Sequence, residues 1–492
     1  MELKDKVFYL PIIILGIYFI IRLVNESLLI FYFPFDLAND FSSHMARLHF
    51  LAKYGFHNLV PDWYNGFNYI LFESYPPGWF FFTLPLFYLI KDIQLTTYIS
   101  LVLIYILIFL AIYFFLGKTQ DLSLTRRFAF FVFFVGNPIA IGYLLRLGKL
   151  PELIGWLLTI IILGIVLWYK DHLINKKFLF FIPLYSLSLI SNVSSFIVMS
   201  PFIISLFLVK KYWERVIIIT SFIFSLVISS FWWIPFFKSS LVKSLGEEAI
   251  YTKWLLNIYS IDSITTWITS LLLILIFYFY WIDKNKSKKE LIFFTPFLIL
   301  AILIFTRLII FIPIYNRPLP DAFNIGFLLV SIYLFLKTKK FEFKLSKSIP
   351  VLLLVLAIIS VLSSLYHTSF FIKPSQLDYD TIELFPFIES NYYIFNAKES
   401  YARAYYSYGA IYNNVTTISG WIDQILTKED IKRKRRMINY FDNGDCPNFL
   451  ASLRDLNVKS AISYDDRCDF LNKCGMIEKI KKGRVCLFVD EK

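Results

Sequence analysis

One stretch of this sequence places acidic, imidazole and basic side chains at a spacing that suits chemistry. Asp40, His44 and Arg47 follow one another at intervals of four and three residues. Residues with this spacing lie on one stripe of a helix. A carboxylate there could act as a general base toward an acceptor hydroxyl or amide, or could hold a metal ion. Helix capping by Asn39 or Asp40 would need no chemistry, and both interpretations stay open.

Aromatic and turn-forming residues follow this stripe and would shape a pocket beside it. Trp63 begins a short run that includes the turn signal Asn65-Gly66. Tyr75 precedes two prolines, which favour an extended backbone. The rings of Trp63 and Trp79 also suit the headgroup belt of a membrane. The helix that carries this polar stripe would also have an apolar face. We therefore predict that this helix lies in the membrane interface, with the polar stripe facing an aqueous pocket.

A second polar cluster lies in the stretch GYLLRLGKLPE, where Arg146, Lys149 and Glu152 precede an apolar run. Glu152 would stand at the start of a helix, where the helix dipole favours negative charge. It could also pair with Asp40 across a pocket and hold a divalent cation such as Mg²⁺ or Mn²⁺. The sequence leaves helix-end stabilisation and metal binding open for Glu152.

Two further arginines stand near the ends of apolar runs. Arg307 is embedded in such a run, and charge within a membrane is costly and is usually functional or paired. Arg317 follows in the stretch IYNRPLPDAF. The planar guanidinium of arginine recognises phosphate through paired hydrogen bonds, so both side chains are candidate substrate-binding groups. Snorkelling toward lipid headgroups is the competing explanation for Arg307.

The composition indicates which elements must position these residues. Of 492 residues, 58% are hydrophobic and 20% are aromatic, and many apolar runs approach the roughly 20 residues that span a bilayer. The first run is too long for a signal-peptide core and has no small-residue cleavage site after it, so we interpret it as a retained helix. The run 79–90 is about half a bilayer long and predicts an interfacial or re-entrant helix. We expect about eleven transmembrane helices, near residues 7–31, 95–116, 127–144, 152–169, 178–193, 194–209, 215–236, 263–282, 290–312, 322–337 and 349–369.

Lysine and arginine cluster in the short loops between the apolar runs, which accounts for the formal net charge of +13. Short basic loops mark the cytoplasmic side of a membrane. This pattern predicts a multi-pass protein of the cell membrane with its N-terminus in the cytoplasm and the loop 32–94, which carries Asp40, outside. The charge is explained by orientation among membrane lipids and gives no support for binding nucleic acid.

The chain changes character after residue 371, where apolar runs shorten and polar residues become frequent. We expect a transmembrane domain over 1–371 and a small extracytoplasmic α/β domain over 372–492. A helix followed by a strand is predicted in LASLRDLNVKSAISY, and a closing strand with alternating faces in GRVCLFVDEK. The four cysteines of the chain are Cys446, Cys468, Cys474 and Cys486. Disulfides fit an oxidising setting, the three pairings stay open, and free thiols or a zinc site are the alternatives.

With these residues in place, the chain resembles the GT-C superfamily of integral-membrane glycosyltransferases. More narrowly, it resembles prokaryotic membrane proteins labelled as related to 6-pyruvoyl-tetrahydropterin synthase. The resemblance rests on the Asp-x-x-x-His run at Asp40, on the Trp63…Gly66 and Tyr75-Pro-Pro steps, and on LRLGKLPELIG around Glu152. Shorter likenesses lie in FWWIPF, YNRPLPDAF, GWIDQ and LRDLNVKSAISYDD.

The resemblance implies a GT-C-like arrangement of helices and an active site at the outer membrane face. It implies transfer of a sugar from a polyprenyl-phosphate donor to a lipid, glycan or protein acceptor. Asp40 would be the catalytic or metal-binding carboxylate, with Asp36 as the alternate, and Arg317 would hold the donor phosphate. Relatives often carry a histidine in an outer turn where this chain has Asn192, which leaves open a member without activity.

Two other classes of function compete with glycosyl transfer: a lipid or polysaccharide transporter and a non-catalytic assembly scaffold. Transporters usually place polar groups at the bilayer midplane, whereas the charges here gather near one predicted surface. No P-loop, GxGxxG, HExxH or GxSxG motif is present. The candidate catalytic residues are Asp40, Asp36 and His44. The candidate substrate-binding residues are Arg47, Trp63, Tyr75, Arg146, Glu152, Arg307 and Arg317.

Overall fold

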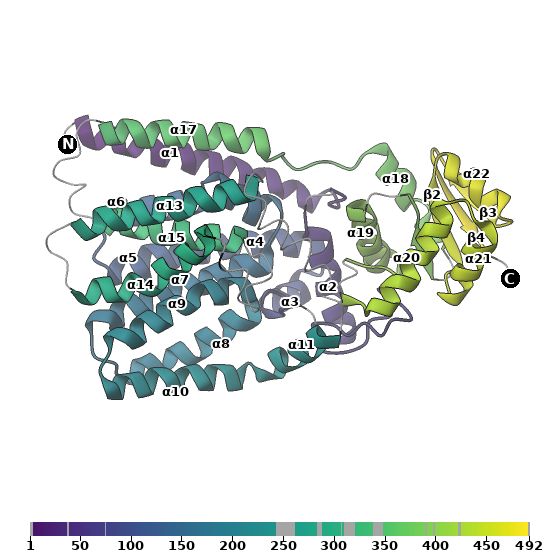
Figure 1. Ribbon diagram of the computed structural model, residues 1–492. Coiled ribbons are helices and arrows are strands. Elements are labelled where there is room, and N and C mark those ends of the chain that lie inside the picture. The colour runs from purple at the N-terminus through teal and green to yellow at the C-terminus, as the bar shows by residue number, and fades with distance from the viewer. Residues whose placement is uncertain are drawn as a thin grey trace.

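The computed structural model describes residues 3–490 except 37–38, 74, 243–260, 283–287, 307, 309–319, 338–347, 389–390, 397–398 and 422–424. Arg307 and Arg317 therefore lie outside the described residues. Figure 1 shows two regions along one axis, a bundle of long helices and a smaller unit of helices and strands that ends near the C-terminus. The helices α2 and α3 lie between the two (Figure 1).

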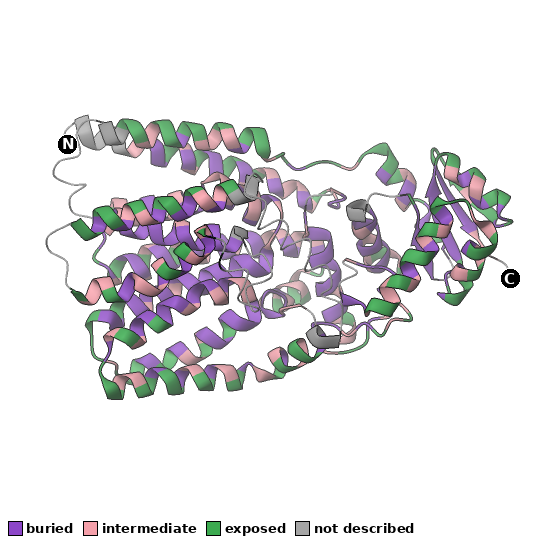
Figure 2. Ribbon diagram, viewed as in Figure 1, coloured by how far each residue is buried: buried purple, intermediate pink, exposed green. Residues whose placement is uncertain are grey.

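The bundle is formed by the apolar runs of the sequence, because a helix satisfies its own backbone hydrogen bonds where water is absent. Its helices are α1 (Leu3–Asn25), α4 (Ile93–Leu110), α5 (Gly117–Thr119), α6 (Leu124–Val135), α7 (Leu150–Asp171), α8 (Phe181–Ser191), α9 (Val193–Val209), α10 (Tyr212–Ile228), α11 (Ser230–Val242), α13 (Ile261–Ile282), α14 (Lys288–Phe305), α15 (Pro320–Lys337) and α17 (Ser348–His367). Helix α7 is central, since 89% of its apolar window is buried against 39% for the first span. The burial colours of Figure 2 show the same difference between the middle and the rim of the bundle.

The number of membrane spans differs from the prediction. Among the described residues, four helices are long and apolar enough to cross a membrane, or up to six segments if each of two bent pairs is one span. Other apolar helices, such as Val193–Val209 and Val351–His367, have 17 residues or fewer. The count of about eleven spans is therefore not confirmed, although the helices follow the predicted apolar runs. The predicted short helix at 79–90 is present as α3 (Gly78–Ile90).

A bend interrupts the run that we predicted as one span over 127–144. Helix α6 ends at Val135, and a π-helical segment over Ala140–Arg146 continues at 70° to it. Pro138 disfavours helical backbone at the residue before it. The Asn137 side chain instead accepts a hydrogen bond from Ala140 N at 2.9 Å, which starts the new segment. After this bend, the basic residues Arg146 and Lys149 lie just before the start of α7.

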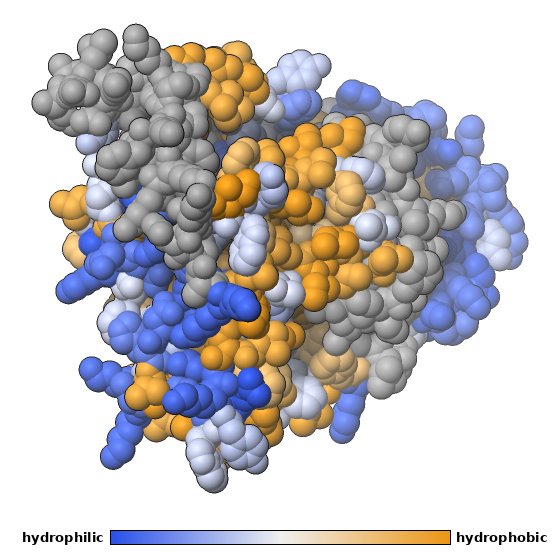
Figure 3. Space-filling view, turned by 60° about the vertical axis from the view of Figure 1, so that its left-hand side comes forward, coloured by the Kyte–Doolittle hydropathy of each residue, from blue (hydrophilic) through white to orange (hydrophobic). Residues whose placement is uncertain are grey.

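Ion pairs gather several basic loops at one end of the bundle. Lys170 Nζ on α7 lies 2.9 Å from Glu290 Oε1 on α14. Lys210 Nζ lies 3.0 Å from Glu214 Oε1, which also accepts from Ile174 N. This end lies away from the C-terminal unit (Figure 1). Figure 3 shows a hydrophobic surface between two hydrophilic zones, the arrangement that a membrane-spanning body requires.

The C-terminal unit is built on a four-stranded sheet of order β1-β2-β4-β3. Strand β1 (Tyr392–Ile394) runs parallel to β2 (Ser460–Tyr464), and β4 (Val485–Val489) is antiparallel to β2 and to β3 (Ile477–Lys482). The predicted helix and strand are confirmed as α21 and β2, and the closing strand as β4. Strand β4 is buried along most of its length instead of alternating, because it lies inside the sheet. The helices of this unit are α18 (Gln376–Ile382), α19 (Glu399–Tyr408), α20 (Lys428–Asp442), α21 (Cys446–Asp455) and α22 (Asp466–Lys473).

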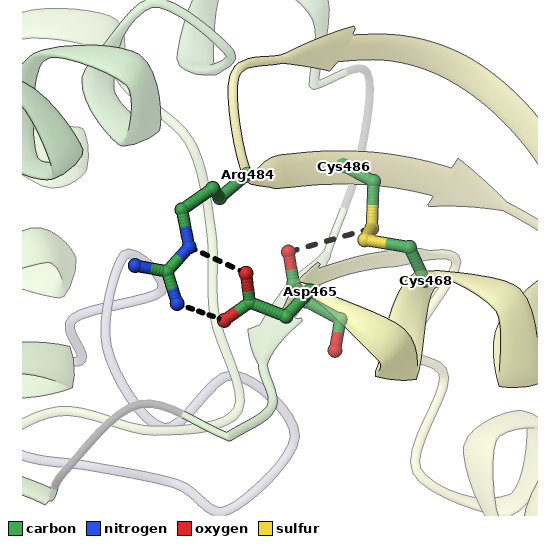
Figure 4. Close-up of a disulfide and its surroundings, with 5 residues drawn as sticks. Asp465, Cys468, Arg484 and Cys486 are labelled. Carbon is green, nitrogen blue, oxygen red and sulfur yellow. Dashed lines mark hydrogen bonds and ion pairs between the residues drawn. A yellow bond between two sulfur atoms is a disulfide. The ribbon is translucent and has the colours of Figure 1, made fainter.

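Two disulfides tie this unit together, as the sequence predicted. The pairs are Cys446–Cys474 and Cys468–Cys486, and no described cysteine is free. The second bond joins α22 to β4, beside an ion pair in which Arg484 Nε lies 2.5 Å from Asp465 Oδ1 (Figure 4). Tertiary structure thereby selects one of the three pairings that the sequence left open.

Candidate active site

The predicted polar stripe lies on α2 (Phe41–Tyr54), between the bundle and the C-terminal unit (Figure 1). Asp40 is the N-cap residue of this helix, but its side chain makes no capping hydrogen bond. The carboxylate instead forms an ion pair with Lys149 Nζ, from the loop before α7. Capping by the Asp40 side chain is therefore the wrong interpretation, because the carboxylate is paired with Lys149 instead.

The backbone fixes the loop of Lys149 against the start of α2. Asp40 N donates a hydrogen bond to Leu147 O at 2.9 Å. Gly148 has φ of 64°, and a Cβ at this position would meet the Phe41 ring at 2.8 Å, so only glycine fits. The Lys149 ammonium is thus held opposite the Asp40 carboxylate. The two side chains keep 29% and 14% of their surface exposed.

The charges near Asp40 decide the protonation of the stripe. Burial acts to raise the pKa of Asp40, but Lys149, His44 and Arg47 together outweigh it and hold the pKa below its usual value. Burial lowers the pKa of His44 to about 3, and Asp40 opposes this shift without reversing it. Near neutral pH, Asp40 is therefore an anion and His44 a neutral imidazole.

His44 and Arg47 face aromatic rings instead of water. The Arg47 guanidinium lies 4.3 Å from the ring centre of Tyr75 and 4.2 Å from that of Trp421. The His44 ring lies 5.8 Å from the ring of Trp79. His44 is 0% and Arg47 2% exposed. The prediction that the stripe faces an aqueous pocket is wrong for these two residues, because α3 and the C-terminal unit cover them.

The loop 32–94 is joined to the C-terminal unit by backbone hydrogen bonds. Tyr64 N donates to Ser419 O at 3.0 Å, and Asn65 N donates to Thr417 O at 2.9 Å. Trp63, a predicted substrate-binding residue, donates from Nε1 to a carbonyl oxygen of α19 at 3.2 Å. Trp63 is fully buried, so it lies within this contact and not in a headgroup belt.

Trp421 is a site residue that the sequence analysis missed. It lies over Arg47 and its ring centre is 6.4 Å from that of His44, although it is more than 370 positions away along the chain. The only signal was the short motif GWIDQ, in which Trp421 stands among polar residues. Helical spacing could not connect it to α2.

Glu152 lies in the first turn of α7, as predicted, and is 4% exposed. Its Oε2 accepts a hydrogen bond from Tyr143 OH at 2.8 Å, and its Oε1 accepts one from Trp156 Nε1 at 3.2 Å. Burial raises the pKa of the Tyr75 phenol, and the charges of Asp40 and Glu152 raise it further. Asp40 and Glu152 are therefore both close enough to the Tyr75 phenol for their charges to act on it.

Asp36 and Arg146 form a second ion pair, which is sealed from solvent. The Arg146 guanidinium donates to the Asp36 carboxylate and, from Nε, to Ser369 O at 2.9 Å. The two side chains are 7% and 2% exposed, respectively. Arg22 on α1 donates to the same Ser369 oxygen at 2.6 Å, and Glu26 is buried nearby. This cluster ties the outer loop to the segment that follows α17.

Asn192 has a structural role. Its side-chain oxygen accepts a hydrogen bond from Ser195 N at 2.8 Å and so caps α9. A Cβ on Gly155 would meet the Asn192 Cβ at 2.9 Å. The turn between α8 and α9 therefore packs closely against α7, about one helical turn beyond Glu152.

The sequence matches no family model and no curated protein, but solved structures share its fold. The oligosaccharyltransferase of Archaeoglobus fulgidus, in a complex with Zn and sulfate, aligns with a TM-score of 0.51 and 12% identity over 91% of this chain and 68% of that chain. The same protein tethered to an acceptor peptide with an NVT sequon gives 0.54 and 12% over 93% and 69%. The arabinofuranosyltransferase AftD from Mycobacteria gives 0.53 and 11% over 96% and 41%. At such low identity these likenesses establish the fold alone.

Proposed function

We propose that this protein, whose fold is that of the GT-C glycosyltransferases, transfers a sugar from a polyprenyl-phosphate donor. The acceptor is a lipid, a glycan or a protein at the outer face of a cell membrane. The observation that carries the proposal is the Asp40 carboxylate. This carboxylate is ionised and partly exposed, and it makes no capping hydrogen bond. Its ion pair with Lys149 holds it near the start of the central helix α7.

The position of Asp40 suits a reaction between a lipid-linked donor and an acceptor from outside. The carboxylate lies where the apolar bundle meets the outer loop and the C-terminal unit, so a donor in the bilayer and a polar acceptor could reach it from opposite sides. In the reaction, the acceptor oxygen or nitrogen bonds to the anomeric carbon and the bond from that carbon to the phosphate oxygen breaks. The bond electrons leave with the phosphate, and the acceptor proton passes to Asp40.

The other candidate residues take supporting places in this proposal. His44 is neutral and buried, so it supplies no charge to the reaction. Arg47 contacts the Tyr75 ring, and the charge of Asp40 acts on both groups. The roles of Arg307 and Arg317 toward the donor phosphate stay predictions, since both lie outside the described residues.

A divalent cation at Asp40 and Glu152, as the sequence suggested, does not fit the side chains of the site. The Asp40 carboxylate is paired with Lys149, and both Glu152 oxygens accept hydrogen bonds from aromatic residues. Among the described residues, no three His, Cys, Asp or Glu side chains could hold a metal together. The proposed reaction therefore uses the protein's own side chains.

The test is sugar transfer by the purified full-length protein in lipid nanodiscs. Labelled polyprenyl-phosphate hexoses and pentoses are offered with lipid, glycan and peptide acceptors. We expect transfer by the wild type and a loss of about 1,000-fold in Asp40→Asn, the scale of a lost general base. Donor binding without transfer in either protein would contradict the proposal and favour a transporter or a scaffold.

Asp92→Asn is the matched control for this experiment. Asp92 is an N-cap residue near the end of the same outer loop, and its side chain does cap its helix, accepting from Leu95 N at 2.8 Å. We expect this variant to lose about 1 kcal/mol of stability or less and to keep transfer. Equal losses of transfer in both variants would mean that Asp40 acts through folding.

A further inference from the structure

We propose that the ammonium group of Lys149 supplies, beside Asp40, the positive charge that a divalent cation would otherwise supply to glycosyl transfer. This inference rests on the proposed function. It assigns Lys149 two roles: to hold the Asp40 carboxylate in place, and to neutralise the charge that forms on the departing polyprenyl phosphate.

The first support is that protein groups already satisfy the three candidate carboxylates of the site, Asp36, Asp40 and Glu152. Asp36 is paired with Arg146, and Asp40 with Lys149. Glu152 accepts its hydrogen bonds from a phenol and an indole. Hard divalent cations need about six oxygen ligands, of which carboxylates are the strongest. A metal ion at Asp40 would have to displace the Lys149 ammonium, and Asp36 and Glu152 already have protein partners.

The second support is that the structure positions Lys149 before any ligand arrives. The hydrogen bond from Asp40 N to Leu147 O and the contact of Gly148 with Phe41 fix the backbone on both sides of the ion pair. Preorganised charge stabilises a transition state without reorganisation at the moment of reaction. A flexible surface lysine would lack this property.

The third support is access, which separates Lys149 from the neighbouring arginine. The Lys149 side chain is 29% exposed, whereas that of Arg146 is 2% exposed and is held by Asp36 and Ser369. A lysine ammonium has three N–H donors. One can bond to Asp40 while another bonds to a phosphate oxygen, so Lys149 can bridge the base and the leaving group.

The chemistry balances without a metal. The acceptor atom forms a bond to the anomeric carbon, and its proton goes to Asp40. The bond between the anomeric carbon and the phosphate oxygen breaks, and its electron pair stays on that oxygen as polyprenyl monophosphate. The product phosphate carries one more negative charge than the donor diester, and Lys149 stabilises this charge by Coulomb attraction and hydrogen bonding.

The decisive measurement is Mn²⁺ binding, because it does not depend on sugar transfer. The full-length protein in nanodiscs is stripped with a chelator and titrated with Mn²⁺ while free Mn²⁺ is followed by electron paramagnetic resonance. We expect the wild type to bind no more Mn²⁺ than Asp40→Asn does. One Mn²⁺ per chain in the wild type, absent in Asp40→Asn, would overturn the inference and restore the metal at Asp40.

Transfer kinetics test what Lys149 does. Chelator is expected to leave wild-type transfer unchanged, and Lys149→Met to lower kcat about 100-fold, the scale of one lost electrostatic donor. Lys53→Met is the matched control, since Lys53 also pairs with an aspartate of the outer loop, Asp62, at 3.3 Å, and is expected to keep kcat. If Mn²⁺ alone restores transfer by Lys149→Met, a positive charge is needed at this position, as proposed. An unchanged kcat in Lys149→Met would overturn the role of Lys149.

The pH profile distinguishes a catalytic from a merely structural effect of Lys149. The charged and titratable groups that act on Asp40 are Lys149 from the loop and His44 and Arg47 from α2. Without Lys149, burial would raise the pKa of Asp40, so the acid limb of kcat/KM should move to higher pH in Lys149→Met. Lys149→Arg keeps the charge and should restore the limb; a limb that does not move in Lys149→Met would overturn the inference.

If the wild type transfers no sugar from any donor, the proposed function fails, and the Mn²⁺ titration still decides which cation pairs with Asp40. If transfer occurs and requires Mn²⁺, the proposed function stands and the assignment of Lys149 fails. The two failures are therefore distinguishable.

Discussion

Two ion pairs join the loop before α2 to the short stretch before α7, but one pair is buried and the other is partly exposed. Asp36 and Asp40 lie four positions apart before α2, and each meets a basic residue from the short stretch before α7. The Asp36–Arg146 pair is sealed, with exposures of 7% and 2%, whereas Asp40 and Lys149 are 14% and 29% exposed. The comparison shows that burial, and not the pairing itself, separates a structural ion pair from one that can meet a substrate.

The two basic residues suit these two surroundings. The planar fork of Arg146 bonds to Asp36 and to Ser369 at once, so the pair joins two segments of chain. The compact ammonium of Lys149 can turn its donors toward different partners. A sealed pair is costly to break because it leaves a buried charge alone, while an accessible pair adds little to stability. We therefore expect stability to depend on the first pair and sugar transfer on the second.

The largest expected effect on stability is the loss of the sealed pair. Arg146→Met should lower the free energy of unfolding by about 3–5 kcal/mol, because the buried Asp36 carboxylate would lose its ion-pair partner Arg146. Lys149→Met should lower it by less than about 1 kcal/mol. Chemical unfolding of both variants in the same detergent measures the difference.

A double variant checks that the cost comes from the unpaired charge. Asp36→Leu combined with Arg146→Met removes both charges and should recover most of the loss, since apolar pairs of similar volume often replace buried ion pairs. Similar destabilisation in Arg146→Met and Lys149→Met would remove the distinction between the two pairs.

The next largest expected effect is a dependence of stability on pH, which comes from His44 near the Asp40–Lys149 pair. The folded pKa of His44 is about 3 and its ordinary value is 6.5, so the unfolded chain gains a proton first as the pH falls. Stability should be full above pH 6.5 and decrease toward pH 3. Thermal unfolding of the wild type and His44→Gln from pH 7 to about pH 4 should show a smaller decrease in the variant.

The same titration could arise elsewhere, so His172 serves as a control for this prediction. His172 lies at the far end of α7 and is exposed. His172→Gln should follow the wild-type pH dependence. If His44→Gln also follows it, the depressed pKa of His44 is not the cause.

A smaller effect is expected where the C-terminal unit covers the stripe of α2. Trp421→Ala removes one of the three rings that lie near the Arg47 guanidinium and should cost about 1–2 kcal/mol, the scale of a partly desolvated cation–π contact. The control is Trp213→Ala, which removes a 76% exposed ring. Faster release of the C-terminal unit by limited proteolysis in Trp421→Ala alone would fit the prediction; equal rates would contradict it.

The smallest effect on stability is expected for an ion pair whose side chains are both exposed to solvent. Asp465 and Arg484 are bonded at 2.5 Å (Figure 4), and the pair lowers the pKa of Asp465, chiefly by hydrogen bonding. Solvent screening should leave Asp465→Asn with no measurable change in Tm. A decrease as large as that of Arg146→Met would show that exposure does not govern the strength of these pairs.

Much of the fold could be predicted because it follows local rules. The apolar runs became helices, the short run at 79–90 became α3, and the cysteines of the C-terminal unit formed disulfides. The run at 127–144 was predicted as a straight span but is bent at Gly136–Pro138, where the capping oxygen of Asn137 starts a new segment. Hydropathy records how apolar a segment is and does not record its direction.

The sequence by itself determined the helical class, the helix at Asp40, His44 and Arg47, and the shared face of these residues, because periodicity is a property of neighbours along the chain. Only the tertiary structure decided that Asp40 pairs with Lys149, that Asp36 pairs with Arg146 and that Trp421 covers Arg47. These contacts join residues more than 100 positions apart, and their burial differs although their residue types are alike. Protonation and access depend on that burial, so the chemistry of each carboxylate was fixed only when the chain folded.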